Sequence, residues 1–346
     1  IYTHKKIEKD KKSINLYKYK YDRLFDYKSI KPEEAKRGLI GIPRVLNMYE
    51  NYPFWHTLFA ECGFEVVLSP ESNMELYQKG ISSVMSDNIC FPAKLVHGHI
   101  IWLIEAKVDR IFYPIVQKEA KEWDGSSNSY NCPVVSGYPE VIRSAINPEG
   151  NYGIPFDKPV VSFHDIDVLR RAAYEYFSGL GIDKDIFLRA FGIAWDFRNK
   201  KKKEMIIEQK ALLDKCLMSG ELVFIVAGRP YHADSLVNQK VGQILADLGI
   251  TALTDDVFLD PHAGEKPNAK YRLLHLLGDG FKRLNMVSQW SYPNRVVHAA
   301  MEVAKLPDNV QLIQLNSFGC GPDSFYMEEV GQILRQAGKN HTVLRI

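Results

Sequence analysis

One order of elements occurs twice in the chain, and this repeat constrains the fold more than any other feature. Each copy has an apolar run typical of a buried strand, a turn with Pro and Arg, a helical pattern, a glycine and a second strand pattern. The copies are 38–42, Pro43-Arg44, 52–62, Gly63 and 65–68, then 222–227, Gly228-Arg229-Pro230, 235–248, Gly249 and 250–253. Strands that alternate with helices predict parallel sheets, so we expect two similar domains.

The predicted fold class is α/β: two similar doubly wound parallel-sheet domains facing a cleft, with a helical connecting segment. The connecting segment is expected to be helical from about 166 to 218, interrupted at Gly179-Leu180-Gly181. The first 36 residues, rich in Lys and Tyr, are expected to form a solvated leader whose aromatic side chains would let it pack along a domain surface. The predicted division is 1–36 leader or linker, 37–145 first α/β domain, 146–220 connector and helical segment, and 221–346 second α/β domain.

Composition narrows the class of protein. With 346 residues, 46% of them hydrophobic and 25% charged, the chain is long enough for two domains or one large α/β body. The net charge of +2 argues against a general nucleic-acid binder, and no run approaches the ~20 apolar residues of a membrane span. The first residue is not Met and no apolar signal region follows it, so we expect a piece of a longer protein.

The cysteines fall into two groups. Five cysteines, an odd number, make a poor disulfide framework, so we expect a reduced, cytoplasmic setting. Cys62 and Cys216 lie within or at the ends of helical patterns, where a free cysteine behaves as a small buried hydrophobe. Cys90, Cys132 and Cys320, the turn cysteines, stand beside Pro or Gly. Cys320 follows a strand pattern, at the strand end where open α/β sheets place ligands.

We predict that the three turn cysteines converge on one metal centre. Thiolates bind iron strongly, and turns rich in Gly or Pro leave room for a cluster and point backbone N–H groups at its sulfurs. An iron–sulfur cluster with an open or non-cysteine fourth position is one interpretation. Zinc with His97 or His99 as the fourth ligand is a second, and three unrelated buried thiols are a third. No Cys-x-x-Cys pair is present to choose among them.

Arg44, Arg229 and His99 are predicted to act at the same site. The two arginines occupy corresponding turns of the repeat, where they could bind a phosphate or carboxylate through their forked guanidinium groups or form an interdomain salt bridge. His99 lies on the helix that follows Cys90, two residues from His97. Residues two apart point to different helix faces, so at most one of these histidines can face a cluster.

Polar residues on neighbouring turns complete the predicted cleft. His232 and Asp234 follow the Arg229 turn, and Asp234 is also placed to cap the helix expected next. Gln289-Trp290 and Asn316-Ser317 are expected along the same cleft. The pattern Gly-x-x-x-x-Gly-Lys-Ser/Thr is absent, so the sequence carries no P-loop ATPase signature.

From residue 37 onward the chain resembles a known family through a series of ordered motifs. They are Gly41–Trp55 (GIPRVLNMYENYPFW), Cys90–His99 (CFPAKLVHGH), Tyr130–Val135 (YNCPVV), Gly228–His232 (GRPYH), Gln289-Trp290 and Gln314–Gly321 (QLNSFGCG). These motifs resemble the uncharacterised domain of acyl-CoA dehydratase activase-related proteins, the 2-hydroxyglutaryl-CoA dehydratase activators. That domain is similar to the cluster-carrying components of 2-hydroxyacyl-CoA dehydratases, benzoyl-CoA reductases and double-cubane-cluster proteins.

The resemblance implies paired α/β domains with a [4Fe-4S] or double-cubane iron–sulfur cluster held by the three turn cysteines. It implies that an ATP-hydrolysing activase domain or subunit, with an actin/hexokinase-like fold, supplies a low-potential electron that passes to a small-molecule or acyl-CoA substrate. Arg44, Arg229 and His99 would supply electrostatics at the site. Neither nucleic acid nor membrane is an expected partner. A homodimer stays open, as do a non-catalytic docking domain of the activase and a zinc-binding structural domain.

Overall fold

The computed structural model describes residues 15–27, 37–123, 126–261 and 289–346. It is α/β, with parallel sheets flanked by helices, as predicted. The strands are β1 (Leu39–Ile42), β2 (Glu65–Leu68), β3 (Arg110–Phe112), β4 (Ile115–Lys118), β5 (Phe156–Asp157), β6 (Val160–Ser162), β7 (Val223–Ala227), β8 (Thr251–Thr254), β9 (Val310–Asn316) and β10 (His341–Arg345).

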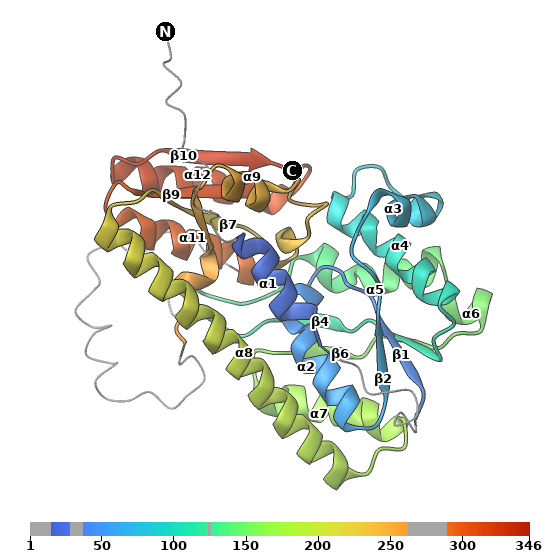
Figure 1. Cartoon of the computed structure of the whole chain (residues 1–346). Coiled ribbons are helices and arrows are strands. Elements are labelled where there is room, and N and C mark those ends of the chain that lie inside the picture. Colours follow the sequence, from blue (N-terminus) through green and yellow to red (C-terminus); the bar gives the residue numbers. More distant parts are fainter. Residues whose placement is uncertain (1–14, 28–36, 124–125, 262–288) are drawn as a thin grey trace.

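The helices cover both sheets and join the two halves of the molecule. They are α1 (Leu16–Phe25), α2 (Met48–Glu61), α3 (Met74–Gly80), α4 (Phe91–Glu105), α5 (Pro133–Ala145), α6 (Pro148–Tyr152), α7 (Ile166–Gly179), α8 (Lys184–Ser219), α9 (Val241–Asp247), α11 (Ser291–Ala304) and α12 (Gly321–Gln336), with short 3-10 turns η1 (Ile81–Ser83), η2 (Pro230–Ala233) and η3 (Asp255–Phe258). Figure 1 shows the two sheets in separate halves, with the long helix α8 running beside both.

The two four-stranded sheets have the same strand order. The first is β2-β1-β3-β5 and the second, read from its other edge, is β8-β7-β9-β10, with every neighbour parallel. In both sheets the order reverses beside the first strand, between β1 and β3 and between β7 and β9. Ligands of doubly wound sheets bind at this reversal, outside the carboxyl ends of the strands. The turns that carry Arg44 and Arg229 follow β1 and β7, so they lie at corresponding strand ends.

The central strands are apolar because helices cover both of their faces. Four of the five residues of β7 are buried, as expected of a parallel strand between two helical layers. The outer strand β2 leaves three of its four residues partly exposed. Burial on both faces therefore explains why 222–227 is the strongest strand pattern in the sequence.

Pro114 divides the first sheet. It separates β3 from β4, and β4 continues in a parallel pair with β6. Proline has no N–H to donate to a ladder, so the sheet breaks there. Strands β5 and β6 lie at 156–162, so the first half takes its last strands from the segment that we expected to be a connector. The helical stretch that follows is interrupted at Gly179–Gly181, as predicted, with φ of +75° at Gly181.

Residues 16–25 form a helix rather than the solvated leader that we expected. Tyr17, Tyr21, Leu24 and Phe25 of α1 are buried, because their spacing of three and four residues places them on one face. The Tyr17 hydroxyl donates to the Val226 carbonyl at 3.2 Å in the second half. In Figure 1, α1 lies between the two halves. The rest of the predicted leader, 1–14 and 28–36, lies outside the described residues.

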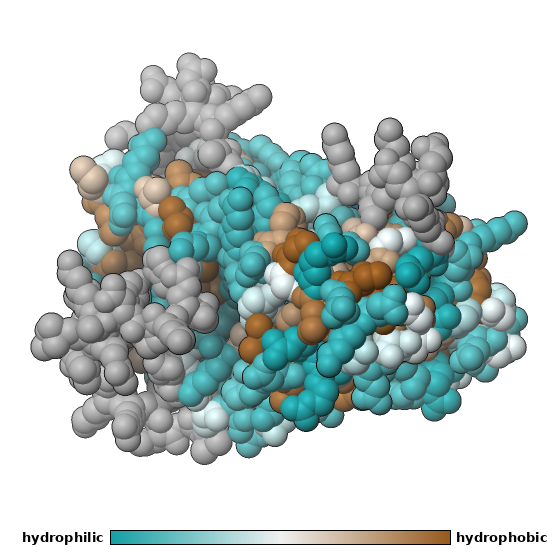
Figure 2. Space-filling model, turned by 90° about the horizontal axis from the view of Figure 1, so that it is seen from below, coloured by the Kyte–Doolittle hydropathy of each residue, from teal (hydrophilic) through white to brown (hydrophobic). Residues whose placement is uncertain are grey.

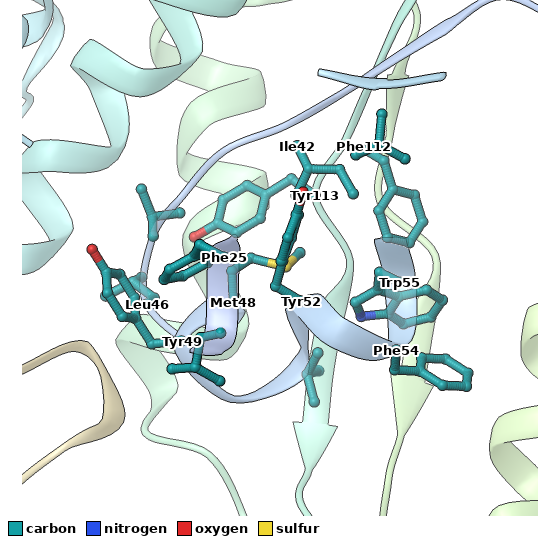
Figure 3. Packing of buried hydrophobic residues seen from close by; sticks show 14 of the residues in the cluster. Phe25, Ile42, Leu46, Met48, Tyr49, Tyr52, Phe54, Trp55, Phe112 and Tyr113 are labelled. Carbon is teal, nitrogen blue, oxygen red and sulfur yellow. The ribbon is translucent and has the colours of Figure 1, made fainter. Parts of the chain in front are cut away.

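Aromatic side chains from both α1 and α2 fill the core of the first half. Figure 3 shows Phe25 against Tyr49, with ring centroids 4.9 Å apart and the rings edge to face. Trp55 packs on Phe112 of β3 at 4.8 Å. Edge-to-face aromatic pairs add to the stabilisation that burial provides. Helix α1 is thus part of this core and closes it.

Polar and apolar residues are mixed over the described part of the face shown in Figure 2. Within the described ranges, no helix is both long enough and apolar enough to cross a membrane.

Candidate functional site

Each of the three turn cysteines immediately precedes a helix. Cys90, Cys132 and Cys320 are the N-cap residues of α4, α5 and α12. A proline occupies the first or second helical position in every case, which suits its fixed φ and its missing N–H. None of the three thiols caps its own helix with a hydrogen bond. Three sulfurs therefore lie at the positive ends of three helix dipoles. At Cys90 and Cys320 the nearby N–H groups of Ala93 and Asp323 oppose, but do not overcome, the rise in pKa that burial causes.

Cys132 raises the pKa of each of the other two turn cysteines. Burial raises the pKa of the Cys90 thiol, and the nearby Cys132 raises it further. Burial raises the pKa of Cys320 to about 11, and Cys132 again adds to the rise. The turns before Cys90 and Cys320 also approach each other, because a Cβ on Gly319 would stand 3.7 Å from the Asn88 carbonyl oxygen. The turns before Cys90 and Cys320, one from each half, therefore lie side by side.

The segment before Cys132 crosses from the first half to the second. The Tyr130 N–H donates to the Gln289 carbonyl at 2.9 Å, and the Ser291 N–H donates to the Tyr130 carbonyl at 2.9 Å. Tyr130 thereby forms a bridge with Trp290, one of the residues expected along the cleft. These bonds fix the position of Cys132 relative to the second sheet.

Arg229 lies beside Cys320 at the reversal of strand order in the second sheet. The guanidinium is buried, its Nη2 is 3.6 Å from the Cys320 sulfur, and it forms an ion pair with Asp323. His232 supports this turn, since its Nδ1 accepts from the Arg229 N–H at 3.0 Å and its Nε2 is 2.9 Å from the Ser317 hydroxyl. Burial lowers the pKa of His232 to about 3, so the ring is neutral.

Arg44 and His99 form a separate polar cluster. Arg44 Nε donates to the Ser69 carbonyl at 3.0 Å and Nη1 bonds the Tyr21 hydroxyl. Both His99 ring nitrogens meet serine hydroxyls, at 2.7 Å for Ser69 and 3.0 Å for Ser72. Burial, together with Arg44, lowers the pKa of His99 to about 3. No hydrogen bond among the described residues joins either side chain to a cysteine.

His97, the other histidine of α4, faces the surroundings of Cys90. Its Nε2 is 3.1 Å from the Tyr138 hydroxyl. Burial raises the pKa of Tyr138 and the neighbouring Cys90 raises it further, so this phenol lies close to that thiol. The two histidines thus occupy different faces, as the spacing requires.

Asp234 joins the two halves. Its Oδ1 accepts from the backbone N–H groups of Leu236 and Val237 at 2.8 and 3.3 Å, as a capping residue would, although α9 begins only at Val241. Its Oδ2 accepts from the Tyr49 hydroxyl at 2.6 Å and from the Ser72 hydroxyl. The cluster of Arg44 and His99 is therefore linked to the second half through this carboxylate.

The metal chemistry expected at the turn cysteines depends on how the thiols are spaced. Across the described ranges, no group of three His, Cys, Asp or Glu side chains could hold a metal ion as placed. Zinc gathers four ligands about 2.0–2.3 Å from one point, so the zinc interpretation has no ligand set there. An iron–sulfur cluster binds its cysteines on separate irons, which needs more widely spaced thiolates.

Sequence reasoning did not select Asp323 as a site residue. The residue lies two positions after the Cys320 motif and occupies the third position of α12, where an acidic side chain usually only complements the helix dipole. Its burial against Arg229 gives it a second role. The sequence signal that could have found it is an acidic residue in the turn after one strand pattern and an arginine in the turn after another, here Asp323 and Arg229.

Comparison with known proteins identifies one family. The model of the CoA enzyme activase uncharacterised domain (DUF2229) matches residues 39–258. A search of curated proteins found no match. Among solved structures, the chain is similar to a protein named "Putative sugar binding protein" from Salmonella typhimurium LT2, with 8% identity, 96% of this chain and 81% of that chain covered, and a TM-score of 0.25.

Proposed function

Because this chain belongs to the family of the CoA enzyme activase uncharacterised domain, we propose that it serves an acyl-CoA dehydratase system as a redox component. Family membership supports the link to that enzyme system. The redox role rests on Cys90, Cys132 and Cys320, which would hold a [4Fe-4S] or double-cubane cluster. When bound, the cluster would supply one-electron transfer at low potential.

The observation that carries this proposal is the shared setting of the three thiols. All three are uncapped N-cap residues with a proline in the first turn, drawn from helices in both halves. Cys132 contributes to the raised pKa of both Cys90 and Cys320. Helix N-termini stabilise negative charge, which a cluster with thiolate ligands carries.

Arg229 and Asp323 would prepare the second half of the site. The Arg229 guanidinium lies against the Cys320 sulfur and would offset the charge of its thiolate. Asp323 holds that guanidinium in place through the buried ion pair. Arg44 and His99 would act at a distance from the sulfurs, through Ser69, Ser72 and Asp234, which makes them positioning residues in this proposal.

The partners would be an ATP-hydrolysing activase domain or subunit as electron donor and a small-molecule or acyl-CoA substrate as acceptor. A family named for a CoA enzyme activase supports an interaction within such an enzyme system. The exposed Phe318 and Phe325, 80% and 76% accessible on either side of Cys320, offer apolar contact area at the edge of the site.

Anaerobic reconstitution with iron and sulfide tests the proposal. We expect the wild-type chain to bind iron and sulfide and to show cluster absorbance, with an EPR signal after reduction. Cys320→Ala should lose most of this uptake, whereas Cys216→Ala, a buried thiol of α8, should retain it. Absent uptake by the wild type, or equal uptake by Cys320→Ala, would reject the cluster.

A non-catalytic docking domain of the activase is the second candidate. The lack, within the described ranges, of any side-chain group placed to hold a metal ion favours it. A variant with all three turn cysteines changed to Ala decides between the two. If that variant still binds the ATP-hydrolysing partner and supports activation of the dehydratase, docking is the function and the cluster is not needed.

A further inference from the structure

A recess with a cationic lining lies where α1, α2 and α8 meet. Its volume is about 440 Å³, counting the open solvent at its mouth, and about 30 Å³ of this admits water-sized groups. None of the turn cysteines lines it. Five cations and two carboxylates do: Lys20, Arg23, Arg198, Lys201 and Lys202, with Glu50 and Asp256.

Four of these five cations have carboxylate partners. Lys20 pairs with Asp256, and Lys202 pairs with Glu50 at 2.8 Å and with Glu122. Arg23 pairs with two carboxylates of α8, Glu208 at 2.9 Å and Glu204 at 3.5 Å. Lys201 pairs with Glu204 at 3.7 Å. These pairs account for the buried carboxylates of the recess and leave one cation over.

Arg198 is that cation. It is only 6% exposed, and its guanidinium lies over the rings of Trp195 and Phe163, at 5.3 and 5.4 Å from their centroids. Its Nη1 donates to Asn199 Oδ1 at 3.2 Å, and its buried Nε has no partner. Among the described residues, no carboxylate lies within ion-pairing distance of it. A buried arginine is normally paired, because removing a charge from water is costly without a counter-charge.

Arg198 acts to lower the pKa of the buried Glu50 and Glu119, so these carboxylates offset part of its charge without forming an ion pair with it. We propose that the recess binds a phosphate-sized oxyanion, which accepts the hydrogen bond that Arg198 Nε lacks. The forked guanidinium matches two oxygens of a phosphate group, and the aromatic rings beneath it hold the fork in one orientation. The inner space fits an anionic group and excludes a nucleoside base, so a larger ligand would extend through the mouth. The anion is therefore free phosphate or the phosphate end of an organic molecule.

An anion in this recess would connect elements that are far apart in the sequence. The lining residues come from α1, α2, α8 and η3, so the occupied recess would hold α1 against both halves. Ligands that bind only the folded arrangement stabilise it, and the stabilisation grows with the logarithm of their concentration over Kd once the site is largely filled. We therefore expect slower amide hydrogen exchange in α1 when the site is filled.

Titration with inorganic phosphate and, separately, with glycerol phosphate tests the proposal, at an ionic strength held constant with sodium chloride. We expect the thermal midpoint of the wild type to rise with phosphate and calorimetry to give one site per chain. Arg198→Lys should bind about tenfold more weakly, because an ammonium group cannot form the two parallel bonds. Arg198→Met should lose the response. Arg189→Met, an exposed arginine of the same helix, should respond as the wild type does.

The two ligands also identify the source of the anion. Tighter binding of the monoester would indicate an organic phosphate, and tighter binding of inorganic phosphate would indicate the free ion. The proposal fails if the wild type responds no more to either than to sodium chloride, or if Arg198→Met binds as well as the wild type. If Arg198→Met does not fold, Arg198→Lys takes its place in the test. The proposal then fails if Arg198→Lys binds phosphate as tightly as the wild type and phosphate does not slow amide hydrogen exchange in α1.

Discussion

Arg229 and Asp323 form a buried ion pair beside Cys320, and its removal should lower the unfolding free energy strongly. Their side chains are only 3% and 7% exposed. Asp323→Asn would leave a buried cation without its counter-charge, which costs about 3–5 kcal/mol of unfolding free energy. Urea unfolding followed by circular dichroism measures this loss.

The matched control lies on the same helix. Arg335 and Glu328 pair at 2.8 Å, but their side chains are 57% and 67% exposed. Glu328→Gln should lower the unfolding free energy far less than Asp323→Asn does, because solvent screens an exposed pair. Similar losses for Asp323→Asn and Glu328→Gln would show that burial does not give the Asp323 pair its importance.

Asp255 gives stability a pH dependence of unusual sign for a carboxylate. Burial, and then Asp256, raise its pKa from 3.8 to about 7, against the opposing pull of Arg295, Lys20 and the Gly228 N–H. The folded protein thus holds a proton that the unfolded chain has released between about pH 4 and 7. Stability from this residue is fully present below about pH 4 and falls as pH rises to about 7, by at most about 1.4 kcal/mol per pH unit.

The test compares wild type with Asp255→Asn in urea unfolding from pH 4.5 to 8. Other groups titrate in both proteins, so the difference between their unfolding free energies isolates Asp255. We expect the wild type to lose stability relative to the variant as pH rises, and to level off above about pH 7. A constant difference across this range would contradict the raised pKa.

Single residues show where sequence reasoning reaches its limit. Proline and glycine beside a cysteine predict a turn before a helix, and all three turn cysteines do begin helices. Which histidine of α4 faces Cys90 depends on the rotation of that helix against α5, and packing sets this rotation. His99 meets Ser69 and Ser72, while His97 meets Tyr138. A spacing of two could say that the faces differ, but not which face is which.

Helices α3 and α4 approach so closely that only glycine fits between them. A Cβ on Gly98 would stand 2.0 Å from the Leu76 carbonyl oxygen, a backbone atom that cannot yield without moving a helix. Gly98→Ala should therefore push α4 away from α3 and cost about 1–3 kcal/mol or more. Because Cys90 caps α4, iron uptake in reconstitution should fall as well.

Gly192→Ala is the control within a helix. No atom lies within 4 Å of a Cβ added there, in the middle of α8. Alanine is the better helix former by about 0.5–1 kcal/mol, so Gly192→Ala should be more stable than the wild type. Thermal unfolding of the wild type, Gly98→Ala and Gly192→Ala measures both effects. A Gly98→Ala variant that gains stability as Gly192→Ala does would disprove the close contact.

Elements were predictable where their pattern depends on local chemistry. Helices α7 and α8 lie where the helical stretch was predicted, with the interruption between them. The helix expected at 235–248 covers only 241–247, since Gln239 and Lys240 have φ of 51° and 61°, in the left-handed region that no sequence pattern announced. Helix α1 was not predicted, because its apolar face is buried only by contacts with both halves, and these contacts are not visible in the sequence.

One buried cluster runs through both halves, beside a second cluster formed by α8 and the second half, so we expect the whole molecule to unfold as one unit. Val226, Ala252 and Ile313 of the second half belong to the same buried cluster as Trp55 and Phe112 of the first. Helices α1 and α8 run along both halves (Figure 1). The repeat in the sequence predicts two similar sheets, yet it contains no information on this joint core, because the contacts are between the copies.

Arg295 links the halves through charge and provides the test of this unity. It is 2% exposed and pairs with Glu122 at 2.7 Å, Glu50 at 3.2 Å and Asp256 at 3.2 Å. Arg295→Ala would leave three buried carboxylates with fewer cations, at a cost of about 3–5 kcal/mol. If the halves unfold together, the slowest amides of β1 and β7 should lose equal protection in native-state hydrogen exchange.

An exposed arginine serves as the control for this variant. Arg143 pairs with Glu140 at 2.6 Å, with side chains 57% and 42% exposed, so Arg143→Ala should lower protection in both sheets by less than about 1 kcal/mol. The contrary outcome is specific. If Arg295→Ala lowers the opening free energy of β7 and leaves β1 unchanged, the sheets are separate folding units, and the buried charges at Arg295 stabilise only the half in which α11 lies.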